Sequence, residues 1–254
     1  MYSDEEYIKA PIEIKNELES FFKFSKPNLI LDIGSCDGLD SIKYSFLFPN
    51  ATIYAFEPIV NNQELIRKNL KKYNVNNIRI VDKALSNEVG EATFYLSSGR
   101  PDNIDHSLDW DFGNKSSSLL PPAKTKDVLP WLEFKDEIKV KTITLYEFIK
   151  SNGFNVVDFI HMDVQGAELL VLEGALTYID SIKMIWLEVE NMELYKNQPL
   201  KNDVEIYLSS KGFVRIKDTV NHIAGDQLWV NYSYFPRKKV TRLIYHLFKK
   251  YFSR

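Results

Sequence analysis

Cysteine is nearly absent from this sequence of 254 residues, because Cys36 is the single one. A lone cysteine excludes an intrachain disulfide and favours a reducing, cytoplasmic location. Long apolar runs are missing too: no stretch of about 18 apolar residues occurs, which excludes an ordinary membrane-spanning helix. The first ten residues are acidic and lack the apolar core of a secretory signal. These absences predict a cytoplasmic protein, with peripheral attachment at the inner membrane surface left open.

Excess positive charge is confined to the end of the chain. Residues 236–254 carry seven Lys and Arg and no acid. The formal net charge of the whole chain is −3, so removing these seven positive charges leaves −10 for the body. An acidic body argues against a broad groove for nucleic acid, because phosphate contact needs a basic face. We therefore expect no nucleic-acid partner.

The same terminal segment has apolar residues at helical spacing, so residues 236–254 are predicted to form a basic amphipathic C-terminal helix. Such a helix either lies on an anionic membrane surface or packs on its own domain or another subunit. The sequence leaves both alternatives open, and it does not specify the oligomeric state. Membrane attachment would suit an enzyme that acts on lipid-linked glycan precursors.

Strand-like and helix-like segments alternate along the body of the chain, which predicts an α/β fold with a mostly parallel sheet. The predicted strands cover 29–34, 51–57, 77–82, 156–163, 182–190, 213–217 and 227–232, and the helices 39–48, 60–73, 168–176 and 201–211. We divide the chain into an N-terminal helical extension, 1–27, with one helix over 5–24, and a main domain, 28–235. Residues 97–130, rich in Ser, Pro, Asp, Asn and Gly, are predicted to be an active-site flap; a surface insertion is the alternative.

A glycine-containing turn, DIGSCDG, follows the first predicted strand. Ligands of open α/β sheets bind at the carboxyl ends of the strands. A dinucleotide site would present a G-x-G-x-x-G turn to a pyrophosphate, but Cys36 replaces the middle glycine. Acids beside the turn better suit a cationic ligand without phosphate, such as S-adenosylmethionine. The predicted contacts of this methyl donor are Asp32, Gly34, Ser35, Asp37 and Gly38.

The next two strands add candidate donor contacts. The second ends in YAFEP, which places Glu57 and Pro58 at the tip of the neighbouring strand. An acid about 20 residues beyond the glycine turn is suited to accept hydrogen bonds from ribose hydroxyls. The third strand ends near Asp82 and Ala84, where an acid or a backbone group would meet the adenine edge.

The chain resembles the FkbM-type methyltransferases. The resemblance runs in order through DIGSCDG, YAFEP, KALSNEVGEATFYLS, KSSSLL, VKTITLYEFI, DFIHMDVQGAELLVLEGA and WLEVE. It implies a Rossmann-like class I methyltransferase fold: a seven-stranded, mostly parallel sheet with an antiparallel last strand and helices on both faces. It also implies S-adenosylmethionine as the donor and, usually, O-methylation of a sugar or another hydroxylated metabolite. Two departures stand out, since Ser35, Cys36 and Asp37 alter the usual turn and Gln165 replaces an acid common in the family.

The chemistry is predicted to lie on the segment HMDVQGAE, at the end of a central strand. Methyl transfer to a hydroxyl is an in-line displacement, and a general base assists it by taking the hydroxyl proton. Strand alternation puts His161 and Asp163 on one face, and Glu168 opens the next helix. Asp163 is the predicted base or acceptor-orienting group, and helix capping is its structural alternative. His161 and Glu168 complete the predicted catalytic set, and a core position is the alternative for His161.

Several further side chains have open roles. Glu188 and Glu190 alternate onto one strand face and, with Asp163, are compatible with a divalent cation, although no metal is expected. Trp110 and Trp131, in or beside the predicted flap, suit either stacking on a sugar ring or anchoring the flap. His222, in a late loop, is interpreted as a surface residue.

The favoured function is therefore O-methylation of a small-molecule or lipid-linked sugar acceptor by an S-adenosylmethionine-dependent enzyme. An NAD(P)-dependent oxidoreductase shares the strand, glycine and acid pattern and is one alternative. A non-catalytic S-adenosylmethionine-binding module is the other, because Gln165 alters the segment expected to carry the chemistry. The sequence does not specify which hydroxyl receives the methyl group.

Overall fold

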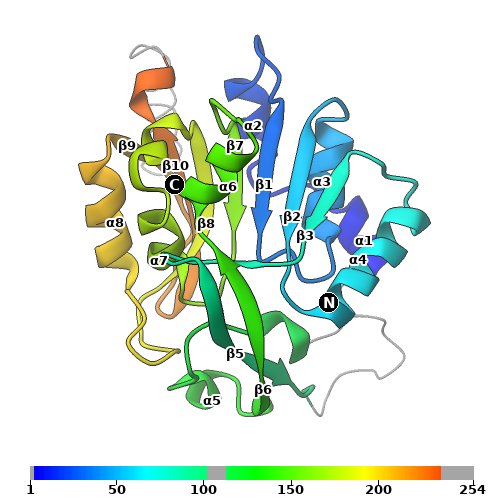
Figure 1. Ribbon diagram of the computed structural model, residues 1–254, viewed down its shortest axis with the longest axis vertical. Helices are drawn as coiled ribbons and strands as arrows, with labels where there is room; N and C mark the ends of the chain where they lie inside the picture. The colour runs from blue at the N-terminus through cyan, green and yellow to red at the C-terminus, as the bar shows by residue number, and fades with distance from the viewer. Residues whose placement is uncertain (1–2, 102–112, 236–254) are drawn as a thin grey trace, which may run out of the picture.

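A seven-stranded sheet forms the centre of the molecule in a computed structural model that describes residues 3–101 and 113–235 (Figure 1). Its strand order is β3-β2-β1-β7-β8-β10-β9, and β10 runs antiparallel to both of its neighbours. The strands are β1 (Leu29–Ile33), β2 (Thr52–Phe56), β3 (Ile78–Val81), β7 (Phe159–Met162), β8 (Met184–Glu190), β9 (Phe213–Asp218) and β10 (Ala224–Asn231). The predicted Rossmann-like methyltransferase sheet is confirmed, including its antiparallel last strand.

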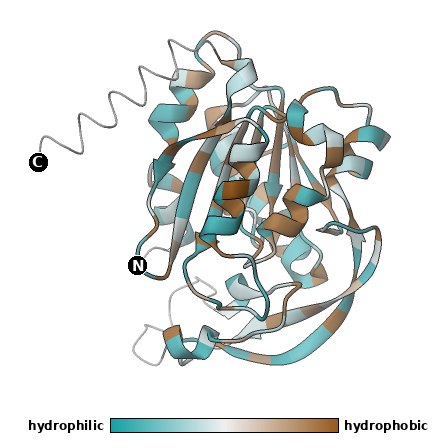
Figure 2. Ribbon diagram, turned by 90° about the vertical axis from the view of Figure 1, so that its left-hand side faces the viewer, coloured by the Kyte–Doolittle hydropathy of each residue, from teal (hydrophilic) through white to brown (hydrophobic). Residues whose placement is uncertain are grey.

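Helices cover both faces of this sheet, and Figure 2 shows hydrophobic residues gathered in the sheet and in the helices beside it. One face packs against α1 (Asp4–Lys9), α2 (Lys15–Phe21), α3 (Leu39–Leu47) and α4 (Val60–Lys72). The other packs against α6 (Leu145–Ser151), α7 (Glu168–Glu173), the 3₁₀ turn η2 (Leu176–Ser181) and α8 (Lys201–Ser210). Because both faces are covered, all five residues of β1 are buried, as parallel strands require.

The N-terminal segment forms two short helices where the sequence predicted one. The helix α1 ends at Ala10, whose extended backbone precedes Pro11, because a proline disfavours helical geometry at the residue before it. The following helix inserts Leu18 and Phe21 into the core beside the sheet, where both are almost fully buried. This segment therefore packs as part of the α1–α4 layer.

A second, three-stranded sheet stands at the carboxyl edge of the first, at the bottom of Figure 1. It pairs β4 (Ala84–Leu85), β6 (Glu133–Ile143) and β5 (Gly90–Ser98) in the order β4-β6-β5, and the sequence analysis did not identify these strands. The segment predicted as a flap leaves the end of β5 and contains η1 (Gly113–Ser116) and α5 (Thr125–Val128) in its described part. Bridges from Ser118 to Tyr95 and from Pro122 to Tyr195 fasten this part to the body.

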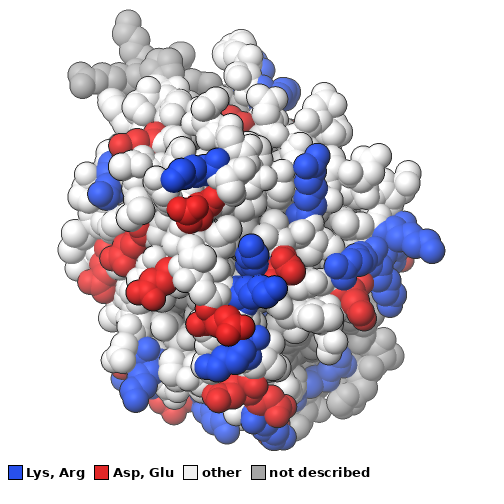
Figure 3. All heavy atoms as spheres, viewed as in Figure 1, with Lys and Arg blue, Asp and Glu red and all other residues white. Residues whose placement is uncertain are grey.

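The surface carries charges of both signs. Figure 3 shows Lys and Arg interspersed with Asp and Glu over one face, which presents no broad basic patch. Within the described residues, no helix combines the length and apolar character needed to cross a lipid bilayer. The predicted C-terminal helix, 236–254, lies outside the described residues, so its membrane or protein contacts stay a prediction.

The ends of β1 and β7 approach each other closely at Gly34. The glycine has a φ of +86°, and a Cβ added there would lie 1.8 Å from the Asp163 carbonyl oxygen. Backbone hydrogen bonds fix this approach, because the Asp163 amide donates to the Ile33 carbonyl at 3.0 Å and the Gly34 amide to the Phe56 carbonyl at 3.2 Å. A side chain at position 34 therefore meets both an unfavourable φ and a steric clash.

Replacing Gly34 with alanine tests this contact. We expect Gly34→Ala to lower the free energy of unfolding by roughly 1–3 kcal/mol more than Gly212→Ala does. Gly212 is a matched control, because its φ of +80° imposes similar strain while nothing lies within 4 Å of an added Cβ. Chemical denaturation of both variants measures the difference, and equal losses of stability would show that the clash is absent.

Candidate functional site

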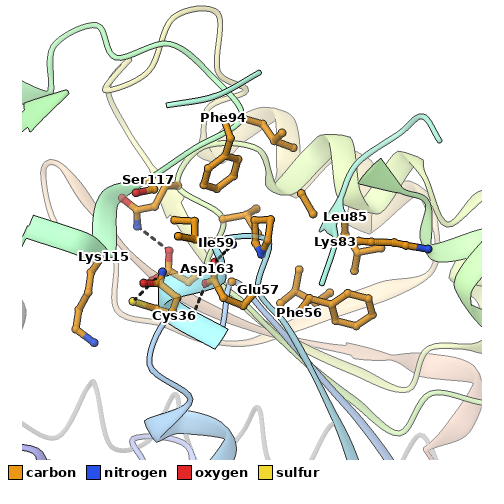
Figure 4. A pocket seen from close by; sticks show the side chains of 18 of the residues that line it. Cys36, Phe56, Glu57, Ile59, Lys83, Leu85, Phe94, Lys115, Ser117 and Asp163 are labelled. Carbon is orange, nitrogen blue, oxygen red and sulfur yellow. Dashed lines mark hydrogen bonds between the residues drawn. The ribbon is translucent and has the colours of Figure 1, made fainter. Parts of the chain in front are cut away.

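A cavity opens at the carboxyl edge of the main sheet, with about 530 Å³ of empty space including the part open to solvent. Its walls come from the ends of β1, β2 and β7, the start of α4, the strands β4 and β5, and the flap from η1 onward (Figure 4). The second sheet and the flap thus enclose a site that the main sheet alone would leave open.

One part of the cavity wall is apolar. Ile59, Leu85, Phe94 and Leu119 line it, from four separate segments of the chain. Figure 4 shows the Phe94 ring above Ile59, and Leu85 lies on β4. Aromatic and branched aliphatic walls of this kind suit a flat, weakly polar group such as a nucleobase.

Glu57 provides a buried acid in the same cavity. Its side chain is 4% exposed, with Oε1 accepting from the Ile59 amide at 2.8 Å and Oε2 from the Cys36 amide at 3.0 Å. Burial raises the pKa of the Glu57 carboxyl to about 7, although both amide bonds oppose the shift. Each carboxylate oxygen can accept a further hydrogen bond, so Glu57 can also accept hydrogen bonds from ligand hydroxyls.

Three residues predicted to contact the methyl donor, Asp32, Ser35 and Gly38, form the turn after β1 but do not line the cavity. The Ser35 hydroxyl donates to the Asp32 carbonyl at 2.8 Å, while the Asp32 carboxylate turns toward α3 and β7. Gly38 has a φ of +75° and precedes α3, where a Cβ would lie 3.0 Å from Ile66. These residues shape the turn that positions Gly34, which does line the cavity.

Two other residues predicted to contact the methyl donor, Asp37 and Asp82, also lie outside the cavity lining, and their contact with the donor stays a prediction. Asp37 forms an ion pair with Lys115 of the flap and accepts from the Leu39 amide at 3.1 Å, at the start of α3. Burial lowers the pKa of Lys115, but the charge of Asp37 outweighs it and raises that pKa. Asp82 is exposed and does not line the cavity, whereas Pro58 and Ala84 do.

The sequence analysis missed the flap residues of the cavity, among them Asn114, Lys115 and Ser117. They are held there by long-range bonds: the Asn114 amide donates to Asn62 on α4, and the Ser118 hydroxyl to the Gln165 carbonyl at 2.7 Å. The serine-rich run KSSSLL was the available signal, but periodicity does not identify the partners of a loop.

Asp163 lines the cavity at the end of β7, as predicted. The Gln165 side-chain amide donates to Asp163 Oδ1 at 2.6 Å and to Glu188 Oε2 at 2.9 Å. The residue that departs from the family pattern therefore sits between two carboxylates and bonds to both. An amide stabilises this pair, whereas a third acid would repel it.

Glu168 lies beneath the turn that carries Asp163, outside the cavity lining. It is 2% exposed, and its Oε1 accepts from the Val164 amide at 3.0 Å and the Gly166 amide at 3.3 Å. Burial and the nearby Glu190 raise the pKa of its carboxyl. These bonds hold the turn, and the catalytic role of Glu168 stays a prediction.

His161 lies on β7 and also outside this cavity lining, two residues before Asp163, which follows the strand. Its Nδ1 is 2.8 Å from Asp32 Oδ1, and its ring packs edge-on against Tyr44 with centroids 5.5 Å apart. Burial alone lowers the pKa of the imidazole, but the hydrogen bond and charge of Asp32 outweigh it and raise the pKa to about 9. An imidazolium is unsuited to take a proton near neutral pH.

The other side chains for which the sequence left the role open include a possible metal site, two tryptophans and His222. No group of three His, Cys, Asp or Glu side chains suited to a metal ion occurs in the described ranges. His222 is exposed in the loop before β10, and Trp131 is partly buried just before β6. Trp110 lies outside the described residues.

Comparison with known proteins decides the family. The family model for the methyltransferase FkbM domain matches residues 32–215. The chain belongs to this family. It is therefore an S-adenosylmethionine-dependent methyltransferase, and the oxidoreductase alternative is wrong.

The individual relatives share less than a third of their aligned residues with this chain. The chain is 28% identical over 223 residues to the 2-O-methyltransferase NoeI of Sinorhizobium fredii, covering 87% of this chain and 86% of that protein. Methyltransferase 1 of Beauveria bassiana is 22% identical over 152 residues, 59% of each chain. Among solved structures, the methyltransferase FkbM of Methylobacillus flagellatus aligns with a TM-score of 0.47 at 13% identity, covering 89% of this chain and 50% of that one.

The cavity residues fit S-adenosylmethionine in this FkbM-family chain. Glu57 suits ribose hydroxyls, the apolar wall suits adenine, and the Asp163 carboxylate suits the positively charged sulfur that S-adenosylmethionine has and S-adenosylhomocysteine lacks. A phosphate cradle would need free amides in the turn, but the Cys36 amide is directed to Glu57. The site therefore matches a cationic nucleoside better than a pyrophosphate.

Titration of Glu57 should control donor affinity. Ribose hydroxyls bond best to an ionised carboxylate, so affinity for S-adenosylhomocysteine should rise, by up to about tenfold, between pH 6 and pH 8. Glu57→Gln should bind more weakly and lose this dependence, as measured by calorimetry. Glu88→Gln, at an exposed position, is the control and should behave like the wild type. A wild-type affinity that is flat across this range would contradict the assignment.

Proposed function

We propose that this enzyme transfers the methyl group to a hydroxyl of a sugar or glycan precursor. The observation that carries the proposal is the position of Asp163, a carboxylate lining the donor cavity at the end of β7. Gln165 holds its Oδ1, while its Oδ2 forms no hydrogen bond with any described residue. An oriented carboxylate with one uncommitted oxygen is suited to accept a hydroxyl proton.

Oxygen as the methyl acceptor is supported by the relative NoeI, a 2-O-methyltransferase. The sugar class is supported by the resemblance to FkbM-type enzymes through the motifs of the donor turn and of β7. Small-molecule and lipid-linked sugars are both candidate acceptors. Contact of residues 236–254 with a membrane would favour the lipid-linked class.

The residues divide the reaction between orientation and proton transfer. When bound, S-adenosylmethionine supplies an electrophilic methyl carbon on a sulfonium. Asp163 takes the hydroxyl proton as the new oxygen–carbon bond forms, while Gln165 keeps its carboxylate in place. The flap residues Ser117 and Leu119 cover the cavity and limit water, which favours alignment of the reacting atoms. The step is balanced because the carbon–sulfur bond breaks and its electron pair stays on sulfur.

The Asp163→Asn variant tests this assignment. An asparagine keeps the acceptor oxygen for Gln165 but is a poor base, so acceptor-dependent release of S-adenosylhomocysteine should fall by roughly 10²–10⁴-fold. Binding of S-adenosylhomocysteine, measured by calorimetry, should stay close to wild type.

A panel of monosaccharides, oligosaccharides and lipid-linked sugars, with mass detection of methylated products, identifies the acceptor. Asp136→Asn is the matched control, because this residue is exposed on β6. Undiminished turnover in Asp163→Asn would remove Asp163 as the base. Donor binding without any methylated product across the panel would favour the non-catalytic module instead.

A further inference from the structure

The Gln165 side chain can serve its two carboxylate neighbours in one direction only. Its amide nitrogen spends both hydrogens, one on Asp163 Oδ1 at 2.6 Å and one on Glu188 Oε2 at 2.9 Å. An ionised carboxylate accepts hydrogen bonds and donates none, so a flipped amide would bring its oxygen against two further acceptors. Holding Asp163 thus requires a donor that keeps the Gln165 oxygen facing away from the acids.

The Tyr195 hydroxyl is that donor. It lies 2.9 Å from Gln165 Oε1 and 2.8 Å from the Ser116 carbonyl of the flap. Both neighbours are carbonyl oxygens, which only accept, so the hydroxyl shares its single proton between them. Among the described residues, Tyr195 is the one donor to Gln165 Oε1. Loss of this hydroxyl would leave the amide oxygen without a partner and the amide free to rotate.

The Tyr195 side chain is closely packed, so its hydroxyl has a defined position. The residue is 1% exposed, and its backbone amide donates to Gln198 Oε1 at 2.6 Å. The Phe134 ring of β6 packs edge-on against it, with centroids 6.2 Å apart. A Cβ added at Gly166 would lie 3.2 Å from Tyr195 Cδ2. The glycine that follows Gln165 therefore lets the tyrosine ring approach the turn.

The backbone of Gln165 is strained at the same place. Its φ of +56° lies in the left-handed region, which residues with long side chains rarely adopt. The Ser118 hydroxyl of the flap donates to the Gln165 carbonyl at 2.7 Å and helps to hold this conformation. Strained residues of this kind gather at active sites, where the surrounding structure fixes them. Both the backbone and the side chain of Gln165 are thus held by residues distant in sequence.

We propose that Tyr195 is a positioning residue for methyl transfer: its hydroxyl fixes the direction of the Gln165 amide, and the amide holds the Asp163 carboxylate in place. This inference rests on the proposed function for the role of Asp163 as base. Tyr195 does not line the donor cavity, so it acts through Gln165. Its hydroxyl keeps its proton throughout, because the acceptor proton goes to Asp163.

Nitrogen-15 NMR of the side-chain amides tests the proposal on the whole chain without any acceptor. With S-adenosylhomocysteine bound, the Gln165 amide protons, assigned by their loss in Gln165→Met, should be protected from solvent exchange. In Tyr195→Phe, which keeps the ring and loses the hydroxyl, they should exchange at least about tenfold faster. Tyr207→Phe is the matched control, because its hydroxyl donates to the Leu172 carbonyl at 3.0 Å outside the cavity lining. It should leave the Gln165 signals unchanged.

Donor affinity separates positioning of the base from anchoring of the flap. Because the Tyr195 hydroxyl also bonds to Ser116, a role in anchoring alone would weaken binding of S-adenosylhomocysteine when the hydroxyl is lost. The flap keeps its bonds from Asn114 and Ser118, so we expect the affinity of Tyr195→Phe to stay within about twofold of wild type by calorimetry. Weaker binding with unmoved Gln165 signals would reduce Tyr195 to a flap anchor and overturn the proposal.

Kinetics test the route through Gln165. With a sugar acceptor found in the methylation panel, kcat of Tyr195→Phe should fall by roughly 10–100-fold while KM for S-adenosylmethionine stays unchanged. In a Gln165→Met background the same change should lower kcat by less than about twofold, because the group through which Tyr195 acts is gone. Fully additive losses would show that Tyr195 does not act through the amide.

Failure of this inference is distinguishable from failure of the proposed function. If Asp163→Asn is inactive but Tyr195→Phe keeps wild-type kcat and amide exchange, Asp163 stays the base and Tyr195 loses its role. If no sugar is a substrate, the amide exchange decides, because it needs no acceptor.

The wild-type chain covers the case in which Tyr195→Phe does not fold. Its Gln165 amide protons should exchange more slowly than those of Asn61, an exposed side chain on α4. Equal exchange at the two positions would mean that the Gln165 amide is not held, and the proposal would be wrong.

Discussion

The close approach of β1 and β7 at Gly34 is the constraint on which the site depends. The Asp163 carbonyl occupies the space where any other residue at position 34 would place its Cβ. The donor turn and the proposed base therefore belong to one rigid junction, fixed by the hydrogen bond from the Asp163 amide to Ile33. Widening this junction by one side chain would separate the donor cavity from the carboxylate, and alignment in methyl transfer tolerates little displacement.

Unbalanced negative charge at the carboxyl edge is the second constraint, and neutral amide groups offset it. Gln165 places its amide between Asp163 and Glu188. The amide orients two carboxylates that an acid at position 165 would repel. Burial of Glu57 and Glu168 is likewise offset by backbone amides.

The sequence was sufficient for features that depend on local pattern. The apolar runs of β1 and β2 were located within one or two residues, and spacing alone placed Glu57 in the cavity. Features that depend on side-chain direction were harder to predict from the sequence. Asp37 and Asp82 follow strands just as Glu57 does, but neither lines the cavity. Asp37 pairs with Lys115, and Asp82 is exposed at the end of the third strand. Periodicity reports which face is buried, and it does not report partners 78 positions apart.

The strands β5 and β6 were missed for a related reason, since their exposed arms lack clean alternation of polar and apolar residues. The role of β5 and β6 is seen only together with the flap, whose hydrogen bonds reach both ends of the site. The Tyr195 hydroxyl lies 2.8 Å from the Ser116 carbonyl and 2.9 Å from Gln165 Oε1. Gln165 also holds Asp163, so Tyr195 and Gln165 connect the flap to the proposed base.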